Sequence, residues 1–145
     1  MVEPIEEAAI KVLECDIEEL TKESYDLYEL SVFSAYGMEY AVGTDEESQA
    51  AAEEAIKNSA WSFRPEFIAS HTKAGATNGM IKAITTLQET CEDCNDDILS
   101  LIEDIEDFVE DAISADGRGT FLATYDSDEI EIKVNGMDYY CYRSA

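Results

Sequence analysis

Residues 129–143 read EIEIKVNGMDYYCYR and carry the clearest structural pattern of the chain. The dipeptide Asn135-Gly136 is typical of a two-residue type I′ turn, which joins two antiparallel strands. A turn at these two residues gives a register in which one face of the hairpin is wholly apolar. On the other face Lys133 lies opposite Asp138, and this pair of opposite charges favours the register as well. The apolar pairs are Ile130 with Cys141, Ile132 with Tyr139 and Val134 with Met137. The pattern predicts a hairpin whose apolar face is buried against helices.

Helical spacing of apolar residues dominates most of the chain before this hairpin. Thr44 followed by Glu47 is a capping box that opens an alanine-rich helix, and Gly117 is a natural stop for another. A third strand is expected at residues 121–125. Helices are expected at residues 4–20, 24–40 with a break at Gly37, 45–61, 80–91 and 96–113, with a short element at 66–71. The predicted fold class is therefore α+β, with several helices packed on a C-terminal three-stranded antiparallel meander in a single acidic domain over residues 1–145.

The composition is strongly acidic. Asp and Glu number 34 against 9 Lys and Arg, which gives a formal net charge of −25. A chain of this charge is repelled by nucleic acid and by anionic membranes, so neither is an expected direct partner. The longest uncharged run, residues 30–38, is nine residues long, whereas a membrane-spanning helix needs at least about 18. The acidic N-terminus lacks a signal-peptide pattern, and we expect a cytoplasmic protein.

Four cysteines are present, at positions 15, 91, 94 and 141. Cys91 and Cys94 form a lone CxxC pair, which we expect to be ordinary thiols at a junction between helices. Zinc is the alternative, but it would need Cys15 and Cys141, or His71, to converge on the pair. A redox role is disfavoured because the neighbouring carboxylates raise the pKa of a thiol.

A calcium loop is a further alternative, since Asp93, Asn95 and Asp97 occupy the first three odd positions of an EF-hand pattern. However, Ile98 then stands where the sharp turn requires glycine, and Asp104 replaces the glutamate of the twelfth position. We therefore expect no metal and no cofactor.

No catalytic residue is predicted. His71 is the one histidine of the chain, and none of the spacing signatures of nucleophilic or phosphate-binding sites is present. We expect His71 to be a polar cap or loop residue and the protein not to be an enzyme.

The distribution of the acids suggests a binding surface. Between Lys82 and Arg118 there are twelve acids and no base, and residues 92–111 hold ten of them. On one helix these ten would span about 30 Å, or one charge per about 3 Å, against about 1.7 Å in duplex DNA. Repulsion between such neighbours costs about 0.2–0.5 kcal/mol per pair, and solubility requires a net charge of only about 2–8. The predicted partner-binding residues, opposite the apolar stripe of the helix, are Glu103, Asp104, Glu106, Asp107, Glu110 and Asp111.

Several stretches between Tyr40 and Arg143 resemble a group of small, acidic, uncharacterised proteins encoded by bacteriophages. The stretches are YAVGTDEE (40–47), WSF (61–63), FIASHT (67–72), ADGRGTFL (115–122), Tyr125-Asp126 and YYCYR (139–143). The resemblance implies a viral accessory protein that acts in the cytoplasm of the bacterial host, and it transfers no catalytic residue.

Together these patterns favour a non-enzymatic phage protein that binds a basic, nucleic-acid-binding host protein through its acidic helix. Such a DNA-mimic-like inhibitor belongs to the class that includes anti-CRISPR and anti-restriction proteins. The alternative is a structural or assembly accessory protein of a phage whose acidity only confers solubility. The sequence predicts no oligomeric state.

Overall fold

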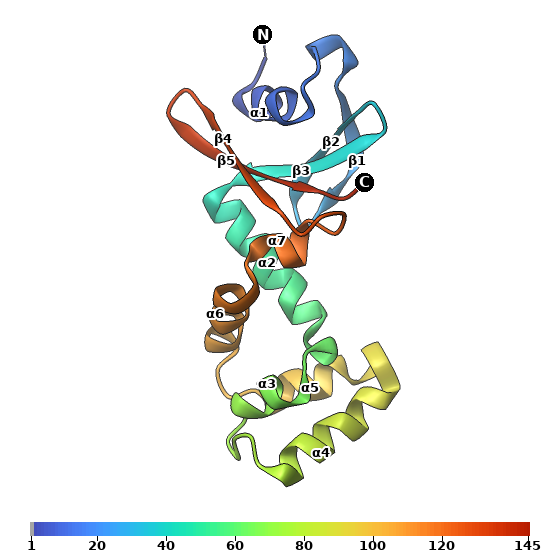
Figure 1. The fold of residues 1–145 in the computed structure, drawn as a ribbon, viewed down its shortest axis with the longest axis vertical. Helices are drawn as coiled ribbons and strands as arrows, with labels where there is room; N and C mark the ends of the chain where they lie inside the picture. The colour runs from blue at the N-terminus through green and yellow to red at the C-terminus, as the bar shows by residue number, and fades with distance from the viewer. Residues whose placement is uncertain (1) are drawn as a thin grey trace. The chain divides into compact units, whose positions relative to one another are not determined.

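A five-stranded antiparallel sheet, in the order β1-β2-β3-β5-β4, is the largest element of the structure (Figure 1). The structure is a computed structural model that describes residues 2–145. The chain divides into a first unit, residues 2–54 with 116–145, and a second unit, residues 55–115. The sheet belongs to the first unit and the second unit is helical. The fold class is α+β, as predicted.

The C-terminal hairpin has the predicted register. Strands β4 (Glu129–Val134) and β5 (Met137–Arg143) pair Ile130 with Cys141, Ile132 with Tyr139 and Val134 with Met137. Val134, Tyr139 and Cys141 are buried, and Ile130 and Ile132 pack against the same core. Met137, next to the turn, is the exception, since it is 54% exposed although its partner Val134 is buried.

The predicted third strand is wrong. Within residues 121–125 the chain completes a short helix, α7 (Arg118–Leu122), and the neighbour of β5 is β3 (Met38–Thr44). Tertiary contacts hold this helix: a Cβ on Gly119 would lie 2.4 Å from the Ser127 carbonyl oxygen. The C-terminal hairpin therefore extends a larger sheet instead of forming a separate meander.

The helix expected at residues 24–40 is also wrong, because this segment forms the end of one strand, the whole of a second and the start of a third. Strands β1 (Thr21–Leu27), β2 (Leu30–Ala35) and β3 are joined by the two-residue turns Tyr28-Glu29 and Tyr36-Gly37. All four turn residues have positive φ, at 48°, 72°, 54° and 78°. Of these four residues, only Gly37 is of a type that indicates a turn with positive φ.

Helices cover both faces of the sheet. Helix α1 (Pro4–Leu13) packs on one face, where its residues Ala8 and Leu13 share a core with Phe33 and Cys141 (Figure 1). This helix is shorter than the predicted 4–20, because Glu14 adopts a left-handed conformation and a 3₁₀ helix, Ile17–Glu19, follows.

The other face of the sheet is covered by α7 and by the start of α2 (Asp45–Asn58) (Figure 1). The predicted capping box opens α2: the Glu47 amide donates to Thr44 Oγ1 at 3.3 Å, and the Thr44 amide donates to Glu47 Oε1 at 2.9 Å. Arg118, the first residue of α7, binds Asp45 at 2.9 Å and Glu129 at 2.7 Å. It thereby links the first residue of α2 to the edge strand β4.

The second unit consists of short helices. After the end of α2 these are a 3₁₀ helix Ala60–Ser62, α3 (Pro65–Ser70), α4 (Asn78–Leu87), a 3₁₀ helix Gln88–Cys94, α5 (Asn95–Leu101) and α6 (Ile105–Asp116). The helix expected at residues 80–91 therefore ends early, and Cys91 breaks the helical path with φ 55° and ψ −135°.

The single helix expected at residues 96–113 is two helices, which is the largest correction in this unit. Ile102 is extended and forms an antiparallel bridge with Thr72, and the Glu103 amide donates to the His71 carbonyl oxygen at 3.0 Å. Asp104 then caps α6, accepting a hydrogen bond from the Asp107 amide at 3.3 Å. The break is set by contacts with a segment 30 residues away, which local periodicity does not reveal.

No helix within residues 2–145 combines the length and the apolar character needed to cross a lipid bilayer.

Gly43 tests the packing of α2 on the sheet. A Cβ on Gly43 would lie 2.4 Å from Leu30 Cδ2 and 3.2 Å from Glu47 Cβ. Gly43→Ala is therefore expected to lower the free energy of unfolding by about 1–3 kcal/mol in urea denaturation. Gly79→Ala is the matched control, since nothing lies within 4 Å of its added Cβ and alanine favours a helix by up to about 1 kcal/mol. Equal stability of the two variants would contradict this packing.

Asn95 tests how the second unit is held together. Its side chain accepts from the Trp61 amide at 3.0 Å and donates to the Lys57 carbonyl oxygen at 2.8 Å. We expect Asn95→Ala to cost about 1–3 kcal/mol of stability, because it leaves backbone groups without partners. Asn58→Ala, at an exposed position, should change stability by less than about 0.5 kcal/mol. If Asn95→Ala leaves the free energy of unfolding in urea unchanged, these hydrogen bonds are not needed for stability.

Candidate functional site

All six predicted partner-binding residues are exposed. Glu106, Asp107, Glu110 and Asp111 lie on α6, and Glu103 and Asp104 lie in the connection that precedes it. We call these six residues the acidic surface. The prediction that they share one long helix is wrong, because that helix is interrupted before α6.

The apolar side of α6 is buried in the second unit. Phe108, Val109 and Ala112 are at most 2% exposed. The Phe108 ring lies 5.1 Å from that of Phe63 and 5.2 Å from that of Phe67, and the three rings anchor α6 to α3. Aromatic pairs at these distances stabilise a small core beyond simple burial. The acidic surface is thus carried by a helix whose opposite side is fixed.

Two of the six carboxylates have partners within the chain. His71 Nε2 lies 3.0 Å from Asp111 Oδ2, and Asp104 caps α6 as described above. His71 stands at the C-cap position of α3, where its backbone amide donates to carbonyl oxygens of Ile68 and Ala69, and its ring packs against Phe67 and Phe108. Among residues 2–145, no Lys, Arg or His nitrogen lies within 4.0 Å of the carboxylates of Glu103, Glu106, Asp107 or Glu110.

The spacing of charge on α6 is close. From Glu106 to Asp111 four carboxylates occupy six residues, or about 7–8 Å of helix axis at about 1.5 Å per residue. This is one charge per about 2 Å, close to the value of about 1.7 Å for duplex DNA. The charge density predicted for residues 92–111 along one helix does not hold, because two helices share this range; a close spacing is found only between Glu106 and Asp111 of α6.

The cysteines and the expected calcium positions Asp93, Asn95 and Asp97 are not part of the acidic surface, whereas Asp104, the twelfth calcium position, is one of its six residues. All four cysteines are free, and Cys91 is exposed while Cys15, Cys94 and Cys141 are buried. Burial raises the pKa of the Cys141 thiol to about 12. The Asn95 side chain is engaged by backbone groups of Trp61 and Lys57. Within residues 2–145, no group of three or more His, Cys, Asp or Glu is placed to hold a metal ion.

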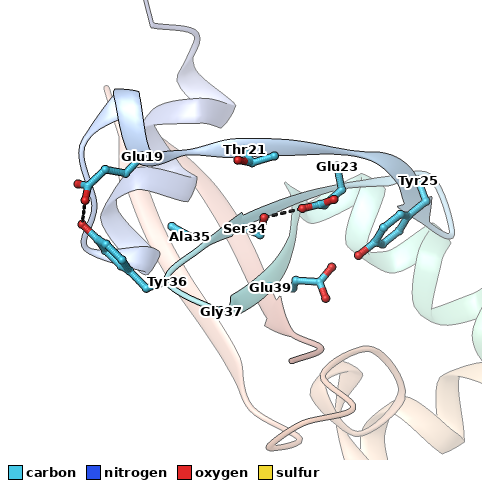
Figure 2. Close-up of a pocket in the computed structure, with 9 residues that line it drawn as sticks. All are labelled: Glu19, Thr21, Glu23, Tyr25, Ser34, Ala35, Tyr36, Gly37 and Glu39. Carbon is cyan, nitrogen blue, oxygen red and sulfur yellow. Dashed lines mark hydrogen bonds between the residues drawn. The ribbon is translucent and has the colours of Figure 1, made fainter.

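A second site, which the sequence did not predict, is a hollow of about 420 Å³ on the sheet of the first unit (Figure 2). We call it the tyrosine pocket. It lies on the face opposite α1, because Thr21, Ser34 and Glu39 are cross-strand neighbours there whereas Phe33 faces the α1 core. The residues that define it are Glu19, Glu23, Tyr25, Ser34, Tyr36 and Glu39.

Hydrogen bonds hold two of the pocket's carboxylates in place (Figure 2). The Tyr36 hydroxyl donates to Glu19, and the Ser34 hydroxyl donates to Glu23 Oε2 at 2.5 Å. The bond to Glu19 raises the pKa of Tyr36 to about 12, and the same bond lowers the pKa of Glu19. The alternation of Thr21, Glu23 and Tyr25 is a strand signal. The prediction missed it because the helix expected at residues 24–40 included Tyr25 and left Thr21 and Glu23 without a predicted element.

No protein-family model, curated protein or solved structure gives a significant match to this chain. The resemblance to acidic phage proteins therefore stays a prediction.

The bond between Tyr36 and Glu19 makes a prediction for alkaline titration. The pKa of Tyr36 is raised from its usual value near 10 to about 12, so the stability that this bond contributes is present below pH 10 and lost as the pH rises toward 12. The phenolate absorbance of the parent should therefore exceed that of Tyr36→Phe only near pH 12. In Glu19→Gln the rise of Tyr36 phenolate absorbance should move back toward pH 10. A parent-minus-Tyr36→Phe difference that already appears near pH 10 would rule out the bond.

Proposed function

We propose that the protein is a non-enzymatic inhibitor that binds a basic, nucleic-acid-binding protein through the acidic surface. The observation that carries this proposal is the set of four exposed carboxylates at Glu103, Glu106, Asp107 and Glu110, none of which has a cationic partner among residues 2–145. Between Glu106 and Asp111 the charge spacing is close to that of duplex DNA, so this segment offers a DNA-binding protein a substitute for the phosphate backbone.

The cost of this arrangement supports a binding role. Like charges three or four residues apart destabilise a helix by about 0.2–0.5 kcal/mol per pair. The side of α6 that supports the fold is the apolar one, with Phe108 fully buried. Apart from the Asp104 cap and the Asp111 contact with His71, the carboxylates of this surface bind no other side chain of residues 2–145, and a basic partner would offset their repulsion. By its resemblance to phage proteins, such an inhibitor would act in the bacterial cytoplasm on a defence or replication protein of the host.

Charge reversal tests the proposal. Replacing Glu103, Glu106, Asp107 and Glu110 with Lys changes the net charge from −25 by eight units to −17. In the test, nucleic-acid-binding proteins from a bacterial lysate are first bound to immobilised duplex DNA. The parent protein is then added, and it should displace from the DNA the protein that it binds. We expect the reversed variant to release none of it and to lose affinity for the purified partner, mainly through slower association. The stability of the variant is measured in parallel, because relief of repulsion on α6 is opposed by the lysines at positions 106 and 107 in its first turn.

A matched control has the same total charge. Reversal of Glu18, Asp26, Glu29 and Asp128, four exposed acids of the first unit, also gives −17 and should leave the release unchanged. Binding of the parent should weaken steeply between about 0.05 and 0.2 M salt. If both reversed variants act like the parent, the acidic surface only solubilises the protein, as the accessory-protein alternative states.

A further inference from the structure

We propose that the exposed side of α4 is a contact surface for a second copy of this chain, and that it binds the acidic surface of that copy. The inference goes beyond the proposed function, because it concerns a surface that the proposed function leaves unused. It rests on a segment of the chain without acids, on two lysines of that segment without carboxylate partners, and on the carboxylates of α6 that match them in charge.

The segment without acids spans residues 67–88. The chain has 34 Asp and Glu among 145 residues, yet none lies between Glu66 and Glu89. This segment contains most of α3, the loop that follows it and the whole of α4. All twelve acids between Lys82 and Arg118 follow residue 88. Charge is therefore segregated within the second unit, with an acid-free part before residue 89 and a strongly acidic part after it.

The cations of the acid-free segment are unpaired. Lys73 and Lys82 are both exposed. Among residues 2–145, no carboxylate oxygen lies within 4.0 Å of either ammonium nitrogen. Arg118 and Lys133 of the first unit, in contrast, bind two carboxylates each. Because acids far outnumber bases in this chain, two exposed lysines without a carboxylate are available to one supplied from outside.

The exposed side of α4 can be covered at little cost. It consists of Lys82, Ala83, Thr85 and Thr86. The Thr85 hydroxyl donates to the Ile81 carbonyl oxygen at 2.8 Å, and the Thr86 hydroxyl donates to the Lys82 carbonyl oxygen at 3.1 Å. A partner on this side therefore leaves no threonine hydroxyl without an acceptor. The short alanine and threonine side chains also lose little conformational freedom when they are covered.

The acidic surface supplies the matching charge. Both α4 and α6 pack on α3, and α6 is fixed there by the Phe108 ring, which lies 5.2 Å from that of Phe67. The lysines and the carboxylates are thus held on separate helices of one unit, and within one chain they form no ion pair. A second copy can bring them together, and such complementary charges favour one contact over others that place acids against acids.

Sedimentation equilibrium of the full chain tests the proposal. At about 0.15 M NaCl the Debye length is about 8 Å, so repulsion between the net charges of two copies is screened more than direct contacts. The mass-average molar mass of the parent should rise above that of the monomer between about 0.05 and 1 mM protein. Lys82→Glu places a carboxylate against carboxylates and should weaken this self-association at least about tenfold.

The matched control is Lys22→Glu, which makes the same change of charge in the first unit. Lys22 is exposed and, among residues 2–145, has no carboxylate oxygen within 4.0 Å. This variant should associate like the parent. If Lys22→Glu and Lys82→Glu weaken the association equally, net charge alone controls it and the proposed contact is wrong.

An exchange of charges between two variants gives a sharper test. The first variant carries Lys in place of Glu103, Glu106, Asp107 and Glu110. The second carries Lys73→Glu together with Lys82→Glu. Each alone should stay monomeric, because like charges then face each other. A mixture of the two should associate, because the new lysines of the first match the new carboxylates of the second. Circular dichroism checks that both variants are folded.

Three results would overturn the proposal: a parent that stays monomeric up to about 1 mM, a Lys82→Glu variant that associates as tightly as the parent, or folded variants that do not associate when mixed. A parent that stays monomeric but is retained on immobilised duplex DNA through Lys73 and Lys82 would assign the exposed side of α4 to nucleic acid instead. Displacement of a partner from DNA is a separate readout, so this proposal and the proposed function can fail independently.

Discussion

Repulsion among carboxylates is the constraint on which the structure depends, because 34 acids share a chain with only 9 Lys and Arg. The first unit meets it by placing cations at strand and helix ends. Arg118 binds Asp45 and Glu129, and Lys133 binds Asp138 at 2.6 Å. The second unit meets it differently: Glu103, Glu106, Asp107 and Glu110 have no cationic partner among residues 2–145. The burial of Phe108 and its ring neighbours holds α6 in place. On α6, the repelling carboxylates thus lie on the exposed side and the buried apolar residues that fix the helix lie on the other.

The sequence predicts those elements whose signals are local. The Asn135-Gly136 turn and the alternation around it define the β4–β5 register, and Thr44 with Glu47 defines the start of α2. The acids of α6 are likewise predictable as exposed, since helical periodicity places them opposite Phe108 and Val109. These predictions need no knowledge of distant residues.

The rest depends on contacts that a local pattern does not contain. Tyr28 and Glu29 adopt positive φ, although neither residue type indicates such a turn. The sequence therefore does not predict the hairpins of β1, β2 and β3, nor the tyrosine pocket that these strands form. Ile102 leaves the helical path because Thr72 pairs with it. Residues 118–122 form a helix in which Gly119 lies close against the Ser127 backbone, a contact that a local pattern does not contain. In each case tertiary contacts override a local propensity.

The most direct test of the account is the dependence of stability on ionic strength. The free energy of unfolding of the parent chain should be measured in urea at NaCl concentrations from about 0.01 to 1 M, over which the Debye length falls from about 30 to 3 Å. If exposed carboxylates repel one another as the structure indicates, stability rises steadily as salt screens them. Stability that is flat or that falls with added NaCl would contradict the account, because the acids would then carry no cost for a basic partner to offset.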